Sequence, residues 1–346
     1  MSELNTLNSN DINPGIVGLG TYFPTKEVDD TLWDNYNFTN VVTGRTPFDG
    51  VETRLEFPED LLPTDAGVIA AQAALNDADI DPSSIDLVLS SSLPGDFIIP
   101  GDVGLLIKKL NLKNATGMNI ETGCASSVSC LMIAASMIQS GMYKNVLIIN
   151  SCFYSRLKDY SCSFSVALGD SVGAMVVSAV PADRGYLSSY AITDGENHSA
   201  FTVDIRKPKQ EYRKGTTEPD LFVSYDYDQA KAATLNSKEY IVTVFNELLE
   251  RSGLQKDDVD IMIPHQGVHW LPTVWSECLD FDMSKVCHTF QQYGSNASSS
   301  VPVNLEEARK RGMLKDGSNI FVFQIGSGFH YKGLMMRWYD KKQYSA

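Results

Sequence analysis

The chain has 346 residues with a formal net charge of −15 at pH 7, and 43% of its residues are hydrophobic. This length suits two domains, or one large duplicated domain, with an ample core. The negative charge argues against general nucleic-acid binding because phosphates would be repelled, and no apolar run approaches the roughly 20 residues of a membrane span. The polar start Met1–Asn10 lacks the order of a secretory signal. We therefore expect a cytoplasmic protein with no nucleic-acid or membrane partner.

Helix and strand signals alternate along the first half of the chain. The elements predicted in order are a helix over residues 65–77, a polar turn and strand within 80–89, a helix that begins after Cys124, and a strand over 145–149. The strands are continuous apolar runs rather than alternating ones. Such strands between helices indicate buried parallel or mixed sheets.

A basic segment lies past the middle of the chain. It contains Arg206, Lys207, Lys209, Arg213 and Lys214. Charge runs of this kind usually face water in solvated loops. The alternative is a docking patch for an anionic cofactor arm or an acidic carrier protein.

The second half repeats the pattern of the first. Its predicted elements are a helix over 238–252, a polar turn and strand within 254–263, and a strand over 319–323. Cys124-Ala-Ser-Ser-Val matches Asn296-Ala-Ser-Ser-Ser-Val. The 33 residues from Ser91 to Cys124 correspond to the 31 residues from His265 to Asn296. This self-similarity predicts two copies of one α/β unit, with Cys124 and Asn296 at equivalent strand-to-helix turns and His265 at a strand end.

Cys124 differs from the other five cysteines in its setting. The chain has no Cys-x-x-Cys pair and no zinc-like spacing, so we expect no metal site. A thiol in the first turn of a helix feels the positive end of the helix dipole, which favours the thiolate. A thiolate is the form that attacks an acyl carbonyl. The position therefore predicts a nucleophile.

From Gly15 to its C-terminus, the chain resembles the condensing enzymes of the thiolase fold, and most of all β-ketoacyl-acyl carrier protein synthase III. The matching marks are Gly50-Val-Glu-Thr-Arg54, the Cys124 turn, Leu168–Ala174, Pro264-His265-Gln266, Gly294-Ser295-Asn296 and Gly326-Ser-Gly-Phe329. The resemblance implies two duplicated βαβαβ-type halves, residues 1–182 and 183–346, in a layered αβαβα structure.

The resemblance also implies a Cys-His-Asn site. Cys124 would accept the acyl group, while His265 and Asn296 would hydrogen-bond the carbonyl of the second substrate. The backbone N–H groups of Cys124 and Gly328 would form the oxyanion hole. The alternative, purely structural roles are a packed core cysteine at Cys124, a strand cap at His265 and a helix N-cap at Asn296. Because all three motifs occur together, in the family's order and on a duplicated scaffold, we favour the catalytic roles. His330 is either cavity-lining or structural.

Donor-binding positions depart from the family pattern. Phe48 stands where these synthases have an arginine that contacts coenzyme A. The position at which they have a second such arginine corresponds in this chain to a place near Trp270. Two explanations fit. The acyl group arrives on an acyl carrier protein, which we favour, or Arg206, Lys207 and Arg213 supply the phosphate contacts while Phe48 and Trp270 flank an apolar mouth.

The segment Leu93–Pro100 is expected to reach across a homodimer and close the partner's acyl pocket. Relatives that join two long acyl chains head to head have a glutamate at the position of Ile99, so that reaction is disfavoured here. These departures suggest a specialised biosynthetic pathway.

The function predicted is acyl loading onto Cys124 from a phosphopantetheine-linked thioester, followed by decarboxylative Claisen condensation with a malonyl-type thioester. No permanently bound cofactor is expected. One alternative passes the acyl group to an oxygen, nitrogen or sulfur acceptor without a carbon–carbon bond. A catalytically silent partner and a cysteine hydrolase are the remaining alternatives.

Overall fold

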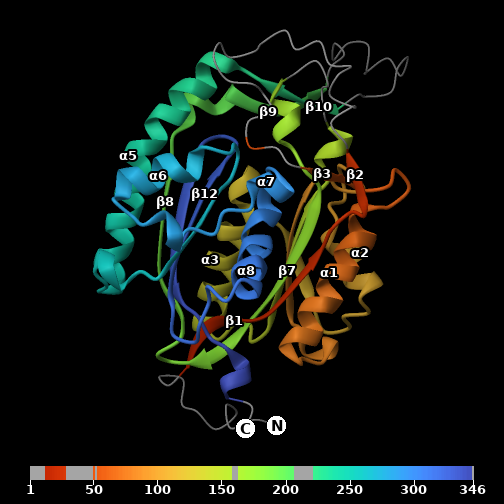
Figure 1. Cartoon of the computed structure of the whole chain (residues 1–346). Coiled ribbons are helices and arrows are strands. Elements are labelled where there is room, and N and C mark those ends of the chain that lie inside the picture. Colours follow the sequence, from red (N-terminus) through yellow and green to blue (C-terminus); the bar gives the residue numbers. More distant parts are fainter. Residues whose placement is uncertain (1–11, 29–49, 51–52, 158–162, 206–220, 345–346) are drawn as a thin grey trace.

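The computed structural model describes residues 12–28, 50, 53–157, 163–205 and 221–344. Two sheets lie side by side, with helices between them and on their outer faces (Figure 1). The fold is mixed α/β, as predicted, and its layers run helix, sheet, helix, sheet, helix.

The first sheet has five strands in the order β1-β7-β6-β4-β5. These strands are β1 (Ile12–Tyr22), β4 (Leu87–Leu93), β5 (Thr116–Asn119), β6 (Val146–Cys152) and β7 (Ser171–Pro181). β7 runs antiparallel to both β1 and β6, whereas β6, β4 and β5 are parallel. The carboxyl ends of β4 and β6 therefore meet at one edge of the sheet.

The second sheet has four strands in the order β11-β12-β13-β8. They are β8 (Gly185–Thr193), β11 (Ile261–Pro264), β12 (Asn319–Gly326) and β13 (His330–Arg337). β13 is antiparallel to β8 and β12, and β12 is parallel to β11. This order and these directions repeat those of β1, β7, β6 and β4, which confirms the predicted duplication. We propose the division between the halves at residues 182 and 183, between the end of β7 and the start of β8.

Three helical layers enclose the sheets (Figure 1). The helices are α1 (Pro63–Ala78), α2 (Val103–Lys109), α3 (Ser126–Gln139), α5 (Tyr227–Ser252), α6 (Leu271–Leu279), α7 (Phe290–Tyr293) and α8 (Ser300–Lys310). α1 and α2 pack on the outer face of the first sheet, and α5 and α6 on that of the second. α3 and α8 form the central layer, whose core takes side chains from both sheets, such as Ile148 and Val322.

Close packing of α1 on the first sheet follows from small residues on both sides. Ala66, Ala70 and Ala74 are fully buried on the helix. A Cβ atom at Gly20 of β1 would lie 2.2 Å from the carbonyl oxygen of Ala70, so only glycine allows this approach. α1 therefore packs directly against the backbone of β1.

The helix predicted over 238–252 begins earlier, at Tyr227. Asp226 caps it by accepting a hydrogen bond from the backbone N–H of Gln229 at 3.0 Å. The added turns are rich in polar residues and alanine, which weakens the apolar periodicity on which the prediction depended. This extension matters because it brings new residues to the site.

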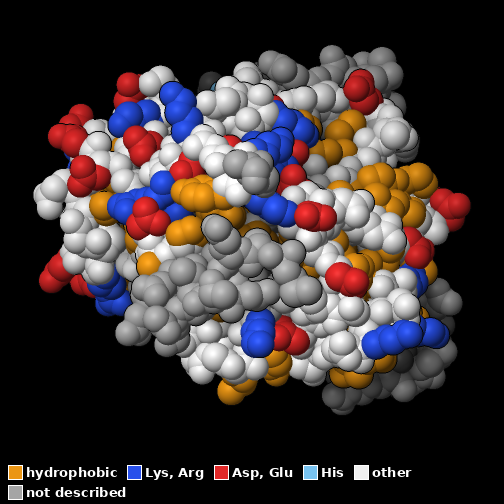
Figure 2. All heavy atoms as spheres, turned by 90° about the horizontal axis from the view of Figure 1, so that it is seen from below, with side chains coloured by type: hydrophobic (Ala, Val, Ile, Leu, Met, Phe, Trp, Pro, Cys, Tyr) orange, Lys and Arg blue, Asp and Glu red, His pale blue; other side chains and the backbone are white. Residues whose placement is uncertain are grey.

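Short elements connect the layers. They include β2 (Lys26–Val28), β3 (Arg54–Glu56), β9 (Phe201–Ile205) and β10 (Leu221–Tyr225). Acidic and basic side chains are interspersed on the face shown in Figure 2. None of the helices in the described ranges combines the length and the apolar character needed to cross a bilayer.

Candidate active site

Cys124 lies in a tight 3-10 turn, Gly123–Ala125, directly before α3. The turn is tied down by side chains: the backbone N–H of Gly123 donates to Glu121 at 2.6 Å, and the hydroxyl of Ser126 donates to the carbonyl of Gly123 at 2.7 Å. Gly123 has φ +57°, a left-handed conformation that suits glycine. The cysteine side chain is 7% exposed. Its exposed part faces a cavity.

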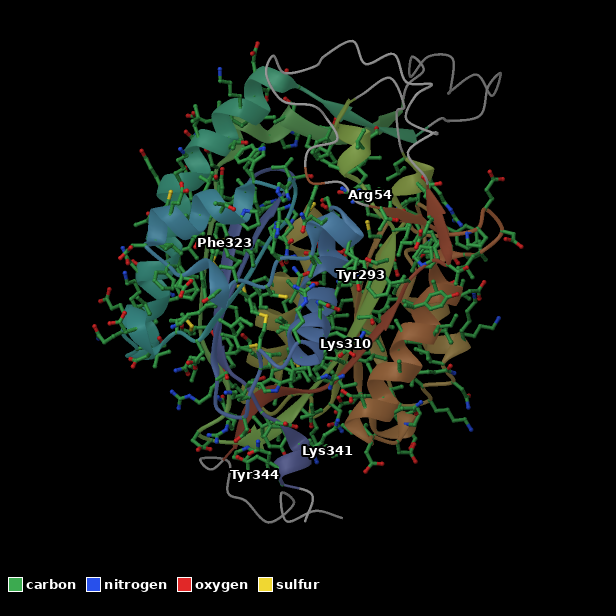
Figure 3. All side chains as sticks on the ribbon, in the orientation of Figure 1. Arg54, Tyr293, Lys310, Phe323, Lys341 and Tyr344 are labelled. Atoms are coloured by element: carbon green, nitrogen blue, oxygen red, sulfur yellow. The ribbon has the colours of Figure 1, made fainter. Side chains whose placement is uncertain are left out.

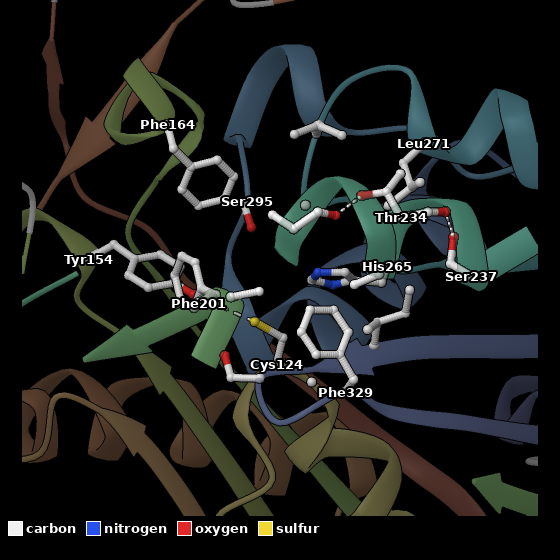
Figure 4. A pocket seen from close by; sticks show the side chains of 18 residues that line it. Cys124, Tyr154, Phe164, Phe201, Thr234, Ser237, His265, Leu271, Ser295 and Phe329 are labelled. Atoms are coloured by element: carbon white, nitrogen blue, oxygen red, sulfur yellow. Dashed lines mark hydrogen bonds between the residues drawn. The ribbon is translucent and has the colours of Figure 1, made fainter. Parts of the chain in front are cut away.

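That cavity has a volume of about 130 Å³ and takes its walls from both halves of the molecule. Its lining includes Cys124, Tyr154, Phe164, Phe201, Thr234, Ser237, His265, Leu271, Ser295 and Phe329 (Figure 4). Most of the wall is apolar, with a few polar groups converging on it. This composition is typical of small-molecule sites.

His265 reaches the cavity from the end of β11, in the second half. Its backbone N–H donates to the carbonyl of Phe323 at 2.6 Å, which extends the parallel pairing past the strand. Gln266 holds the next turn: its side-chain oxygen accepts from the backbone N–H groups of Thr289 and Phe290. The Pro-His-Gln sequence therefore contains one residue that lines the cavity, His265, and one that holds the neighbouring backbone in place, Gln266.

The imidazole of His265 is buried and neutral. Burial lowers its pKa to about 4. Its Nδ1 atom has no hydrogen-bond partner among the residues that the structure describes. A buried polar atom without a partner is costly, so the imidazole is held in the cavity wall with part of its hydrogen-bonding capacity unused.

Asn296 precedes the turn Ala297–Ser299, which leads into α8 as the Cys124 turn leads into α3. Its side chain is 2% exposed, and Nδ2 donates to the carbonyl of Tyr293 at 3.0 Å. Asn296 does not line the cavity, but its neighbour Ser295 does. The apolar cluster that holds Cys124 also contains Ala297, so the two equivalent turns lie against each other.

The Leu168–Ala174 motif fixes the position of Ser295. The backbone N–H of Ser295 donates to the carbonyl of Ala167 at 2.7 Å, and the N–H of Gly169 donates to the carbonyl of Ser295 at 3.1 Å. Asp170 is buried and accepts from the backbone N–H groups of Phe57 and Ser155. The motif thus joins the first half to the Asn296 turn.

Arg54 supports the same end of the molecule, where Figure 3 places it above Tyr293. It is fully buried; Nε donates to the carbonyl of Val166 at 2.9 Å, and Nη1 donates to that of Phe290 at 3.2 Å. Burial lowers its pKa to about 9. Its role is to hold backbone segments together behind the site.

The turn between β12 and β13 packs on the nucleophile turn. A Cβ atom at Gly326 would lie 1.9 Å from the carbonyl oxygen of Thr122, so glycine is needed there. Gly326, Ser327 and Phe329 line the cavity, and Gly328 lies among them with φ +79°. The predicted oxyanion-hole residue therefore belongs to a turn that borders the thiol.

The protonation state of Cys124 differs from the sequence-based expectation. The helix start predicts a thiolate, yet burial raises the pKa of Cys124 to about 11, and the hydrogen bond with Tyr154 offsets only part of this rise. Removal from water outweighs the helix dipole because the turn lies inside the molecule. The cavity wall therefore holds both a neutral thiol and a neutral imidazole.

The other predicted pocket residues lie elsewhere. Ile99 is 86% exposed on the turn before α2, outside this cavity. Trp270 lies between the lining residues Val268 and Leu271 and packs on the apolar core of the second half. His330 shares a 2.9 Å hydrogen bond with Thr193 and does not line the cavity. Phe48, Arg206, Lys207 and Arg213 fall outside the described residues.

Several lining residues were missed by the sequence analysis, notably Tyr154, Phe201 and Thr234. Tyr154 lies two residues past the end of β6. Ligands of α/β sheets bind beyond the carboxyl ends of the strands, and that rule could have identified it. Thr234 lies on the part of α5 that precedes the predicted helix start, so no periodic signal marked it. Within the described ranges, no group of His, Cys, Asp or Glu side chains is arranged to hold a metal ion.

Comparisons with known proteins agree with this geometry. Two family profiles match: 3-oxoacyl-[acyl-carrier-protein] synthase III over residues 118–195, and the C-terminal part of the same family over residues 249–338. A β-ketoacyl-[acyl-carrier-protein] synthase III of Listeria monocytogenes is 29% identical over 328 residues, which cover 94% of this chain and 99% of the relative.

Solved structures show the same fold. A 3-oxoacyl-[acyl-carrier-protein] synthase III of Aquifex aeolicus superposes with a TM-score of 0.81 at 26% identity, covering 94% of this chain and 100% of that one. The priming β-ketosynthase of the R1128 polyketide pathway reaches 0.83 at 24% identity, covering 95% and 97%. The duplicated fold and the cysteine-containing cavity thus define an acyltransferase of the condensing type in the thiolase superfamily. Within that superfamily, the chain is a β-ketoacyl-acyl carrier protein synthase III-like protein.

Proposed function

We propose that this enzyme loads an acyl group from a thioester onto Cys124 and condenses it with a malonyl-type thioester to give a β-ketoacyl thioester. In the first half-reaction Sγ bonds to the acyl carbon and the carrier thiol leaves with a proton. In the second, loss of carbon dioxide from the malonyl unit generates an enolate, whose carbon bonds to the acyl carbon as the C–S bond to Cys124 breaks; the released thiolate then takes up one proton from solvent.

One observation carries the proposal. A cysteine from the first half and a histidine from the second line the same largely apolar cavity. The imidazole is neutral, with a buried Nδ1 that no described residue engages. A neutral imidazole can donate a hydrogen bond to a thioester carbonyl and stabilise the enolate that forms from it.

Condensation is favoured over transfer to an oxygen, nitrogen or sulfur acceptor. Such acceptors need a base, whereas the enolate needs hydrogen-bond donors at its oxygen. We propose His265 and Asn296 as these donors. One N–H of Asn296 is used by the Tyr293 carbonyl. Because Asn296 lies just behind the lining residue Ser295 rather than in the cavity wall, this role requires its amide to turn toward the cavity when substrate binds.

We propose an acyl carrier protein as the donor, with the phosphopantetheine thioester as substrate and no permanently bound cofactor. The support is Trp270, which stands beside the cavity wall near the position where the family has a coenzyme A-binding arginine. A specialised biosynthetic pathway in the cytoplasm is the setting that we propose for this reaction. Phe48, Arg206, Lys207 and Arg213 remain candidates for donor contacts.

We further propose a homodimer. Phe97, Ile98 and Ile99 are 61%, 72% and 86% exposed at the tip of one turn. The turn is held by Asp96, whose carboxylate accepts from Thr64 and whose backbone N–H donates to Asp102 at 2.9 Å. Three consecutive exposed apolar side chains on an anchored turn fit a partner surface. Light scattering should give twice the chain mass of 38.1 kDa.

The decisive experiment measures intact mass after incubation with acyl thioesters of coenzyme A and of carrier protein, with and without malonyl donors. We expect a stable acyl adduct that disappears in Cys124→Ala. Cys130→Ala is the matched control. Cys130 is a second buried thiol, on α3, but it belongs to the central core, so the Cys130→Ala variant should still form the acyl adduct on Cys124.

The alternatives predict different outcomes. A β-keto product that depends on the malonyl donor supports condensation, and an adduct discharged only to another acceptor contradicts it. Turnover with water alone indicates a hydrolase. No adduct from any donor indicates a silent partner.

A further inference from the structure

Tyr154 places its phenol at the nucleophile. It lies two residues past the end of β6, in the short helix Tyr154–Arg156, and only 1% of it is exposed. Its hydroxyl oxygen is 3.5 Å from Sγ of Cys124. The close-up view shows the two side chains pointing toward one another (Figure 4).

The phenol is held rigidly in this position. Its ring packs edge-on against Phe201, with ring centroids 6.4 Å apart, and it belongs to the same apolar cluster as Cys124, Leu157 and Leu168. Among the described residues, Sγ of Cys124 is the hydrogen-bond partner of this hydroxyl. A buried hydroxyl normally has a hydrogen-bond partner, and for Tyr154 that partner is the thiol of Cys124.

We propose that Tyr154 is a catalytic residue that donates a hydrogen bond to Sγ of Cys124 while the sulfur carries negative charge. The inference rests on the proposed function. During acyl loading, the proton of Sγ passes through the imidazole of His265 to the sulfur of the departing carrier, as the new S–C bond forms and the old one breaks. The proton of Tyr154 stays on its oxygen throughout.

The same hydrogen bond acts in both half-reactions. In the first, Sγ becomes charged as it attacks; in the second, it becomes charged again as the enolate displaces it. In the acyl-enzyme between them, sulfur is an uncharged thioester and a weaker acceptor. The phenol therefore stabilises the two charged states more than the intermediate, which is the differential binding that accelerates a reaction.

The protonation states of the neighbours fit this role. Burial and the adjacent thiols hold the pKa of Tyr154 well above its usual value, so it remains a donor when the thiol ionises. The titratable groups facing Sγ are Glu121 on the same turn, Tyr154 from beyond β6 and His265 from beyond β11. Glu121 raises the pKa of Cys124, and the bond from Tyr154 lowers it.

The test is the pH profile of Cys124 alkylation by iodoacetamide in Tyr154→Phe and wild type, followed by intact mass. We expect the apparent pKa of the thiol to rise by about one unit, because a hydrogen bond to a charged group contributes roughly that much. Alkylation at pH 8 then slows about tenfold. The rate of acyl loading should fall with little change in KM for the donor.

Tyr331→Phe is the matched control, because it also removes a fully buried phenol hydroxyl, here bonded to the carbonyl of Ala233. It should leave the alkylation profile unchanged. If Tyr154→Phe fails to fold, a fluorinated tyrosine at position 154 keeps the shape and makes the phenol more acidic, which should shift the profile to lower pH. A profile unmoved by either change at position 154 overturns the proposal.

This readout separates the inference from the proposed function, since alkylation requires no acyl donor. A shifted profile with no acyl adduct in wild type would contradict the acyltransferase role and keep the Tyr154–Cys124 contact. A normal acyl adduct in wild type together with an unshifted alkylation profile would support the acyltransferase role and contradict the proposed role of Tyr154.

Discussion

Single residues of the site are held in their neutral forms by burial. The thiol of Cys124, with a pKa of about 11, and the imidazole of His265, with a pKa of about 4, are both neutral near pH 7 and form no ion pair with each other. Charge therefore develops on sulfur only during reaction, where donors already in position stabilise it at no reorganisation cost. The helix start was visible in the sequence, but the depth of burial that outweighs it depends on the second half of the molecule.

The buried imidazole also makes the fold sensitive to acid. The pKa of His265 falls from 6.5 to about 4 on folding. Between pH 6.5 and pH 4, therefore, this imidazole is protonated in the unfolded chain but neutral in the folded one. Stability should decline as the pH falls over this range, by on the order of 3 kcal/mol from this residue. Melting temperatures of wild type and His265→Asn across this range check it. His288 and His330 have lowered pKa values too, so the difference between the two curves is the measure. Parallel curves would contradict the prediction.

At the scale of elements, the sequence predicted those with strong apolar signals. The strands predicted within 80–89 and 254–263 and over 145–149 and 319–323 are confirmed as β4, β11, β6 and β12. The start of α5 at Tyr227 and the turn that carries Tyr154 were not predicted. Neither has apolar periodicity of its own: α5 begins with a polar, alanine-rich stretch, and the Tyr154 turn is shaped by packing on Phe201 from a distant segment. Long-range packing of this kind leaves no local trace in one sequence.

The junction of β12 with the nucleophile turn makes a sharp prediction. In Gly326→Ala the new Cβ would meet the carbonyl of Thr122 at 1.9 Å, so the two turns must separate. We expect a loss of roughly 1–3 kcal/mol in stability. Acyl loading should fall by about a hundredfold, because a shift near 1 Å displaces the thiol from the oxyanion donors.

Gly104→Ala on α2 provides the control for that substitution. Apart from its chain neighbours and the backbone of its own helix, no atom lies within 4 Å of its new Cβ, and alanine is favoured over glycine inside a helix by about 0.5–1 kcal/mol. It should be slightly stabilised and fully active. Loading rates from stopped-flow and urea midpoints measure both variants; wild-type loading in Gly326→Ala would remove this turn from the oxyanion hole.

The whole molecule gains its site from duplication. Two units with the same strand order present equivalent turns, one with Cys124 and one with Asn296, across a shared central layer. The hydroxyl of Ser127 in the first half bonds to Asn150 and also to the carbonyl of Ser298 in the second. Each half alone would expose one face of α3 or α8. The site and the stability of the protein therefore depend on the same interface.

This shared layer predicts that the halves unfold together. Leu131 of α3 is 4% exposed in the central core, and Leu131→Ala should cost about 2–5 kcal/mol. Three of the four tryptophans, Trp270, Trp275 and Trp338, lie in the second half and Trp33 lies in the first, so tryptophan fluorescence reports mainly on the second half, while circular dichroism reports on both. At one fixed protein concentration, urea curves from the two probes should coincide in wild type and shift equally in Leu131→Ala. Met142→Ala, at a side chain 65% exposed, should shift neither. A fluorescence midpoint that stays in place while the dichroism curve moves would show two independent units, and the central layer would then be an interface between domains rather than one core.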